Sequence, residues 1–217
     1  MSRSREQLEN WLKTIEVKEP YKVLDIGGSQ LPVRDRLLFF DNTGEYKILD
    51  LEIPHECKQK PDIIGDIQEI YEEDSEKGRT IFINGNYTNT DIYPEKNTLY
   101  SYFDVVFCIE VSEYWIRPLN ALKAINFLLK KGGTLYISFH TLYGLHKPEG
   151  LVYLNYTRYG IEKLLKETGF EIEEIITKDI SEDGRQALIE FYKAEGMKIL
   201  YNNETFKEGY LLKCKKI

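Results

Sequence analysis

The most regular feature of the chain is a series of short apolar runs separated by longer polar stretches. Each run has the length of a β-strand, and the runs of successive apolar residues favour strands buried on both faces. The predicted strands are residues 22–26, 46–49, 61–64, 103–109, 134–139, 170–177 and 209–215. Apolar residues spaced three and four apart predict helices, which are residues 4–15, 119–129, 159–168 and 186–194.

Strands that alternate with helices, or with gaps long enough to hold one, indicate an α/β protein with a mainly parallel sheet. The chain shows no linker and no internal repeat, so residues 1–217 are interpreted as one domain. Residues 1–20 supply an N-terminal helix that either covers the site or forms a homodimer contact. Residues 71–101 are too polar and too long for a simple connection. We expect an insertion or lid there, with a hairpin turn at Asn84 and Gly85.

Composition narrows the class of protein. The 217 residues are 42% hydrophobic and 30% charged, as in ordinary soluble proteins, and the net charge of −7 argues against non-specific binding to nucleic-acid phosphates. No apolar run approaches the ~20 residues of a membrane span, and residues 1–10 lack the apolar core of a signal peptide. The three cysteines form no CxxC pair, which predicts reduced thiols and no zinc. We expect a cytoplasmic protein without metal, nucleic-acid partner or membrane span.

Acidic residues end or follow successive predicted strands. Asp25 lies in the first strand, just before a pair of glycines, whereas Asp50, Asp66 and Glu110 come at the ends of the next three. Ligands of an open parallel sheet bind outside the carboxyl ends of its strands, so these acids are expected around one crevice. Any one of them alone is explained equally well as a turn former or a helix cap. The ordered set beside a glycine turn favours a bound ligand.

The glycine turn indicates which ligand to expect. Its sequence GGSQLP (residues 27–32) lacks the second and third glycines of the dinucleotide fingerprint G-x-G-x-x-G, and the chain has no Walker phosphate loop. Pyrophosphate binding is therefore poorly supported, and an NAD-dependent oxidoreductase is disfavoured. A nucleoside without phosphates fits better, because acids accept hydrogen bonds from ribose hydroxyls and from the adenine amino group.

From residue 22 to residue 178, with a break at the insertion, the sequence resembles class I S-adenosylmethionine (SAM)-dependent methyltransferases. The segments that carry the resemblance are VLDIGGSQ (23–30), LDLE (49–52), GDIQEI (65–70), FDVVFCIEVSEYW (103–115) and LLKKGGTLYISF (128–139). The resemblance implies a Rossmann-like three-layer sandwich, whose seven-stranded, mainly parallel sheet has an antiparallel last strand. It also implies SAM as the methyl donor and S-adenosylhomocysteine (SAH) as the product.

Site residues follow from the same resemblance. It implies that Asp25 orders the glycine turn, that Asp50 accepts the ribose hydroxyls and that Asp66 meets the adenine amino group. Ser29 stands where the family usually has the second glycine of G-x-G, and its hydroxyl can donate to the carboxypropyl group of SAM. The complete set of implied cofactor-binding residues is Asp25, Gly27, Gly28, Ser29, Asp50, Leu51, Asp66, Ile67, Ile109 and Glu110.

The acceptor side is expected in the segment after the fifth predicted strand, which begins at a strand carboxyl end. An alcohol acceptor needs a base, and the candidates are His140, His146, Glu110 and Glu113, each of which is also explained by an ordinary loop or helix-start role. Aromatic residues there either stack on a sugar or fill the core, namely Trp115, Tyr143, Tyr153 and Tyr156. Arg158 either pairs with an acidic acceptor or with a surface glutamate.

The acceptor itself is suggested by a second resemblance. The segment HKP (146–148), followed by LNYTRYGIEKLLKETGF (154–170), is similar to a pattern in methyltransferases encoded near glycan-assembly genes. It implies transfer to a hydroxyl of a sugar or cell-surface glycan, and so an O-methyltransferase for glycan modification. The alternatives are methylation of a small metabolite or a protein, and a catalytically inactive binding module with the same fold. A DNA amino-methyltransferase is disfavoured, because the segment CIEVSE (108–113) lacks its usual proline-rich motif.

Overall fold

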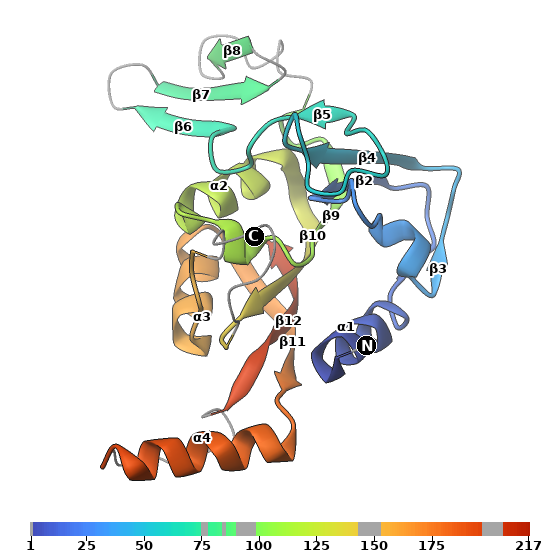
Figure 1. Ribbon diagram of the computed structural model, residues 1–217. Helices are drawn as coiled ribbons and strands as arrows, with labels where there is room; N and C mark the ends of the chain where they lie inside the picture. The colour runs from blue at the N-terminus through green and yellow to red at the C-terminus, as the bar shows by residue number, and fades with distance from the viewer. Residues whose placement is uncertain (1, 75–77, 84–85, 90–98, 143–152, 197–205) are drawn as a thin grey trace.

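The computed structural model describes residues 2–74, 78–83, 86–89, 99–142, 153–196 and 206–217 (Figure 1). Its centre is a seven-stranded sheet with the order β11-β12-β10-β9-β2-β4-β5. The strands are β2 (Lys22–Ile26), β4 (Glu45–Asp50), β5 (Ile63–Ile64), β9 (Phe103–Cys108), β10 (Leu129–His140), β11 (Phe170–Asp179) and β12 (Lys207–Lys216).

Only the last strand runs against the others. β12 pairs antiparallel with both β10 and β11, whereas β2, β4, β5, β9 and β10 pair in parallel. The predicted fold class, with seven strands and an antiparallel last strand, is therefore confirmed. The chain builds outward from β2 in one direction and returns on its other side as β9, so the switch point lies between these two strands.

Helices cover both faces of the sheet. On one face α1 (Arg3–Leu12) buries Leu8, Trp11 and Leu12 against residues of the central strands, including Val23 and Phe107. On the other face α2 (Pro118–Leu128) and α3 (Arg158–Glu167) pack onto the larger core cluster. The apolar side of α1 is thus buried in its own chain, which favours the covering role over the dimer contact.

The gaps after β2 and β4 hold no α-helix. Between β2 and β4 the chain forms the 3-10 turn η1 (Val33–Arg36) and the strand β3 (Phe39–Phe40), which pairs with β1 (Glu16–Val17). Pro32 precedes η1, and Phe39 and Phe40 are drawn into the pairing with β1, so the helical turn does not continue. Beyond the sheet, α4 (Glu182–Ala194) projects from the edge with no buried residue.

The insertion forms a separate small sheet. β6 (Tyr71–Asp74), β7 (Gly78–Ile83) and β8 (Asn86–Asn89) pair antiparallel, and β6 lies against α2 (Figure 1). β7 and β8 make the predicted hairpin, although its turn at residues 84–85 lies outside the described residues. Within the part of the chain that is described, no helix is long and apolar enough to cross a membrane.

Candidate active site

The turn after β2 requires the two glycines that the sequence places there. Gly27 has a φ of +75°, which L side chains rarely adopt, and a Cβ on it would lie 2.5 Å from Cγ2 of Val111. A Cβ on Gly28 would lie 2.4 Å from Oδ2 of Asp25. Neither position accepts a larger residue unless its neighbour moves, so the backbone of this turn stays bare at the carboxyl end of β2.

Asp25 of β2 accepts hydrogen bonds close to the glycine turn. Its Oδ2 accepts a hydrogen bond of 2.7 Å from the backbone N–H of Val33 and another from the hydroxyl of Tyr46. The side chain is buried, and this burial raises the pKa of Asp25 to about 6, although the two hydrogen bonds favour the ionised form. Asp25 therefore fixes Val33, which follows the glycine turn, against Tyr46 of β4. Its ordering of the turn itself and its contact with a ligand stay predictions.

Ser29 and Asp50 join the turn to the end of β4. The N–H of Ser29 donates to Oδ2 of Asp50 at 3.2 Å, and the N–H of Leu51 donates to Oδ1 at 2.8 Å. The hydroxyl of Ser29 is buried, yet it has no hydrogen-bond partner among the described residues. Leu51 is half exposed beside the partly exposed Asp50. This corner combines an acceptor, an unpartnered hydroxyl and an apolar surface.

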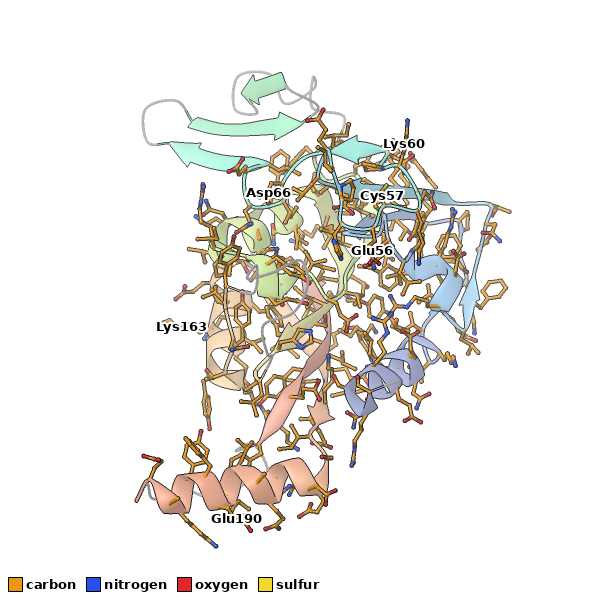
Figure 2. All side chains as sticks on the ribbon, viewed as in Figure 1. Glu56, Cys57, Lys60, Asp66, Lys163 and Glu190 are labelled. Atoms are coloured by element: carbon orange, nitrogen blue, oxygen red, sulfur yellow. The ribbon has the colours of Figure 1, made fainter. Side chains whose placement is uncertain are left out.

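Asp66 forms the next turn and caps it. Its Oδ1 accepts from the N–H of Gln68 at 2.9 Å, and its carbonyl accepts from the N–H of Ile70 at 3.1 Å. The side chain of Ile67 is buried in the main core, so only its backbone faces this turn. Figure 2 shows Asp66 on the side of the molecule that carries the insertion. The structure thus assigns Asp66 a turn-forming role, and its contact with adenine stays a prediction.

Glu110 is bound by the N-terminal helix. It has a φ of +57°, its N–H donates to Oγ of Ser138 at 2.7 Å, and its carboxylate accepts from the guanidinium of Arg5. The preceding residue, Ile109, is buried in the cluster that packs against α1. Glu110 therefore meets another part of the chain, and its contact with the methionine end of SAM stays a prediction.

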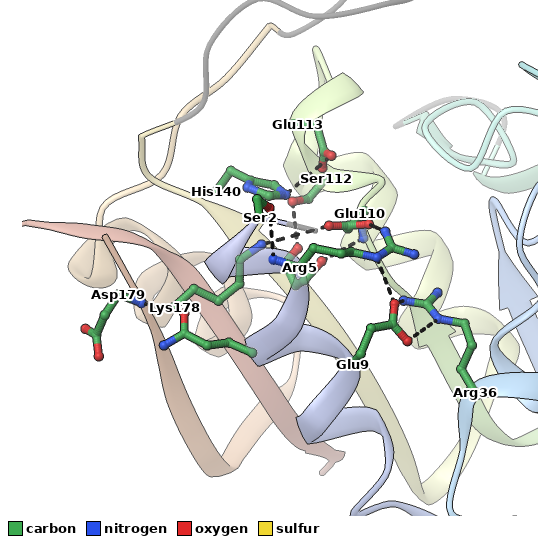
Figure 3. A network of polar contacts seen from close by, with 12 residues as sticks. Ser2, Arg5, Glu9, Arg36, Glu110, Ser112, Glu113, His140, Lys178 and Asp179 are labelled. Carbon is green, nitrogen blue, oxygen red and sulfur yellow. Dashed lines mark hydrogen bonds and ion pairs between the residues drawn. The ribbon is translucent and has the colours of Figure 1, made fainter. Parts of the chain in front are cut away.

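Figure 3 shows that this contact belongs to a larger charged network under α1. Arg5 also pairs with Glu9 at 2.8 Å, and Glu9 binds the guanidinium of Arg36 through both carboxylate oxygens, at 2.9 and 3.2 Å. Because Arg36 belongs to η1, the network connects the segment after the glycine turn to Glu110. Arg36 also lowers the pKa of Asp25, against the larger effect of burial.

Glu113 and His140 meet at the carboxyl ends of β9 and β10. Nε2 of His140 lies 3.5 Å from Oε1 of Glu113, and both side chains are fully buried (Figure 3). Burial raises the pKa of Glu113 to about 8, so this carboxyl group holds its proton at neutral pH. The backbone around the pair is held by Tyr156, whose N–H donates to the His140 carbonyl and whose hydroxyl donates to the Ser112 carbonyl.

The aromatic residues of the acceptor side largely fill the core. Trp115 and Tyr156 are buried and pack edge-on against Phe139, so they do not form a sugar-stacking surface. Tyr153 keeps 48% of its surface exposed and still fits that role. Arg158 pairs with Glu162 at 2.8 Å, as the alternative interpretation expected. His146 and Tyr143 lie outside the described residues, so their roles stay predictions.

Sequence reasoning missed Arg5, Glu9, Arg36 and Lys178. Lys178 is fully buried at the carboxyl end of β11, with Nζ 4.0 Å from Oε1 of Glu110. Its position at the end of a predicted strand is the same signal that selected the acids, but only acids were considered. Across the described residues, no group of three histidine, cysteine or acidic side chains is arranged to hold a metal ion.

Comparison with known proteins identifies the fold. A family model described as a methyltransferase domain matches residues 67–137, about a third of the chain. A SAM-dependent methyltransferase from Archaeoglobus fulgidus superposes with a TM-score of 0.56 at 15% identity, over 99% of this chain and 92% of that one. One from Mesorhizobium loti gives 0.55 at 10% identity, over 98% of both chains. No curated protein matches the sequence.

A third similar structure contains a ligand. Phosphoethanolamine N-methyltransferase 2 of Haemonchus contortus, crystallised with SAM, gives a TM-score of 0.54 at 14% identity, over 98% of this chain and 52% of that one. The chain has the class I SAM-dependent methyltransferase fold. The comparisons support methyl transfer in general and SAM as the cofactor.

The residues of the glycine turn after β2 and of the end of β4 fit SAM. The glycine turn leaves its backbone bare, the buried Ser29 hydroxyl has no partner among the described residues, and Asp50 is partly exposed beside an apolar Leu51. A methionine carboxylate would satisfy the hydroxyl, and ribose hydroxyls would satisfy the remaining lone pairs of Asp50. The serine in place of the usual glycine is therefore compatible with the cofactor.

Proposed function

We propose that this protein is an O-methyltransferase that moves a methyl group from SAM to an acceptor hydroxyl of a sugar or glycan. The observation that carries the proposal is the buried pair of His140 and Glu113, 3.5 Å apart, at strand ends beyond the proposed cofactor turn. A hydroxyl group is a weak nucleophile, and a histidine is the usual base that removes its proton at neutral pH.

The cofactor end is held by residues of three strand ends. Gly27 and Gly28 let the backbone approach SAM, Ser29 donates to its carboxylate, and Asp50 accepts its ribose hydroxyls. Asp66, together with the Ile67 N–H, contacts adenine in this proposal. When bound, SAM supplies a methyl group made electrophilic by its positively charged sulfur.

His140 and Glu113 handle the proton. In the proposed step, His140 accepts the proton of the acceptor hydroxyl as the oxygen forms its bond to carbon. The Glu113 carboxyl keeps its own proton at neutral pH, and its Oε1, 3.5 Å from Nε2 of His140, orients the imidazole that takes up the hydroxyl proton. His146 and Glu110 remain alternative bases, although the contact of Glu110 with Arg5 favours an ionic role for it.

The experiment that tests the cofactor site is calorimetric titration with SAM and SAH. We expect saturable binding, weakened by about 1–3 kcal/mol in Asp50→Ala, because this change removes a charged acceptor from two hydroxyls. Asp41→Ala, which removes a partly exposed acid bonded to Thr43 of its own turn, is the matched control and should bind as the wild type does. Binding that is unchanged in Asp50→Ala would refute this site.

A second candidate is a binding module that keeps the fold without catalysis. The observation that favours it is Ser29, which occupies the turn where the family usually has a glycine. If neither SAM nor SAH binds at about millimolar concentration, this candidate replaces the enzyme.

If SAM binds, a screen with labelled methyl groups over sugars, small metabolites and proteins identifies the acceptor. Sedimentation tests the homodimer contact that is the alternative role of residues 1–20, and a single-copy mass would refute it.

A further inference from the structure

Lys178 is a fully buried lysine near the end of β11. Its side chain is fully inaccessible, and Nζ donates no hydrogen bond to any described residue. An ammonium group in such a place is destabilised by lost hydration, and burial accordingly lowers the pKa of Lys178. Among the described residues, its one ion pair joins Nζ to Oε1 of Glu110 at 4.0 Å. This distance is beyond a hydrogen bond, so the donors remain to be satisfied.

The sheet places Lys178 on the same face as the proposed base. Gly209 of β12 is the register partner of His140 on one side and of Lys178 on the other. Directly opposed residues of antiparallel strands project to the same face, so the two side chains flank a glycine that has none. A Cβ on Gly209 would lie 2.2 Å from the carbonyl oxygen of Phe139, so the strands require this gap in the row of side chains.

Glu110 lies between two cations. It accepts from Arg5 on one side and faces Lys178 on the other (Figure 3). Arg5 and Glu110 keep 29% and 24% of their side chains exposed, whereas Lys178 is buried behind them. Glu110 also has a left-handed backbone, which residues other than glycine rarely adopt and which is typical of functional sites.

Two further carboxyl groups act on Lys178. Glu208 and Glu113 both favour its charged form, but less than Glu110 does, and Glu113 holds its proton at neutral pH. The carboxylate of Glu110 is therefore the main anion that acts on Lys178. An exogenous anion that came within hydrogen-bond distance of Nζ could replace it.

We propose that Lys178 and Arg5 form a subsite for an oxyanion carried by the acceptor, a carboxylate or a phosphate, which displaces the carboxylate of Glu110. The inference rests on the proposed methyl transfer, because it places the charged group of the acceptor beside His140. It narrows the acceptor to acidic molecules, such as uronic acids or phosphorylated sugars. The anion receives hydrogen bonds from Lys178 that Glu110 does not accept.

The test titrates SAH-loaded protein with sodium phosphate and, separately, with sodium acetate at constant ionic strength. We expect saturable binding of at least one anion in the millimolar range, weakened tenfold or more in Lys178→Met. Lys163→Met, which changes a lysine that is 77% exposed on α3, is the matched control and should bind as the wild type does. Phosphate binding alone assigns a phosphorylated acceptor, and acetate binding alone assigns a carboxylate. No binding in the wild type, or equal binding in Lys178→Met, overturns the subsite.

A second variant covers a failure of Lys178→Met to fold. Glu110→Gln removes the competing carboxylate and should tighten anion binding several-fold, whereas unchanged or weaker binding contradicts the proposal. The same titrations without SAH separate the two proposals. Anion binding in a protein that does not bind SAH would contradict methyl transfer alone, and SAH binding without anion binding would contradict the subsite alone.

Discussion

Two acids near the strand ends of this protein have pKa values well above those of the same residues in water. Glu113 has a pKa of about 8 and Asp25 a pKa of about 6, and burial is the main cause of both shifts. Buried acids with raised pKa values are typical of sites that move protons, although structural networks contain them as well. Here the two have different surroundings. Asp25 is satisfied by Val33 and Tyr46, whereas Oε2 of Glu113 has no hydrogen-bond partner among the described residues.

The pKa of Glu113 predicts how stability depends on pH. The folded state holds this proton up to about pH 8, whereas the unfolded chain releases it near 4.5. The contribution of Glu113 to the free energy of unfolding therefore falls as pH rises between these values. In Glu113→Gln this contribution is absent. The stability of the variant relative to the wild type should rise between about pH 5 and about pH 8, by at most about 4 kcal/mol.

Urea unfolding at the two pH values measures this difference. Glu190→Gln, on the exposed surface of α4, is the matched control and should follow the wild type at both. A Glu113→Gln variant whose relative stability is the same at both pH values would contradict the raised pKa.

Among the elements, α1 has two functions at its two ends. Its second half is anchored by Leu8, Trp11 and Leu12, which are buried against the sheet, whereas its first turn places Arg5 on Glu110. The helix therefore covers the charged network only while its apolar side stays packed. Because the gaps after β2 and β4 contain no α-helix, α1 and η1 supply the helical cover of this face.

Removing the anchor should destabilise the protein. Leu8 is fully buried, so Leu8→Ala should lower the free energy of unfolding by about 2–5 kcal/mol through lost burial and a residual cavity. Leu38→Ala makes the same change at a residue that is 59% exposed, and it should cost no more than ~0.5 kcal/mol. Equal costs in the two variants, measured by urea unfolding, would show that α1 is not part of the cooperative core.

At the scale of the whole molecule, the switch point divides the site into two halves. Most of the proposed cofactor residues lie at the ends of β2, β4 and β5, whereas His140, Glu113 and Lys178 lie at the ends of β10, β9 and β11. Ile109 and Glu110, which follow β9, stand between the two sets. Cofactor binding and proton transfer therefore depend on separate parts of the sheet. A change in one half should leave the other half functional.

The division predicts that His140→Gln keeps its affinity for SAM within about twofold but slows methyl transfer by ~10²–10⁴. Calorimetry measures the first quantity and transfer of labelled methyl groups measures the second. His55→Gln, at an exposed loop histidine, is the control and should retain both. Normal turnover in His140→Gln would remove this residue as the base and leave His146 and Glu110.

The strands could be predicted from the sequence, because their signals are local runs of apolar residues. The range 22–26 coincides with β2, and the other predicted strands differ from the observed ones mainly at their ends, because apolar runs report buried strands directly. The lack of an α-helix after β2 goes with the pairing of Phe39 and Phe40 with β1, which the length of the gap does not reveal. The roles of Trp115 and Tyr156 also depended on packing, since an aromatic residue fits a core and a ligand surface equally well.

The sequence by itself determined the order of the strands along the chain, the glycine turn and the acid at each strand end. These features depend on neighbouring residues, whose spacing and conformational limits act locally. Only the tertiary structure decided that Arg5, Glu110 and Lys178 meet, because parts of the chain far apart in sequence are brought together by α1, β9 and β11. It also decided which acids keep their protons, because burial and partners are properties of the packed molecule.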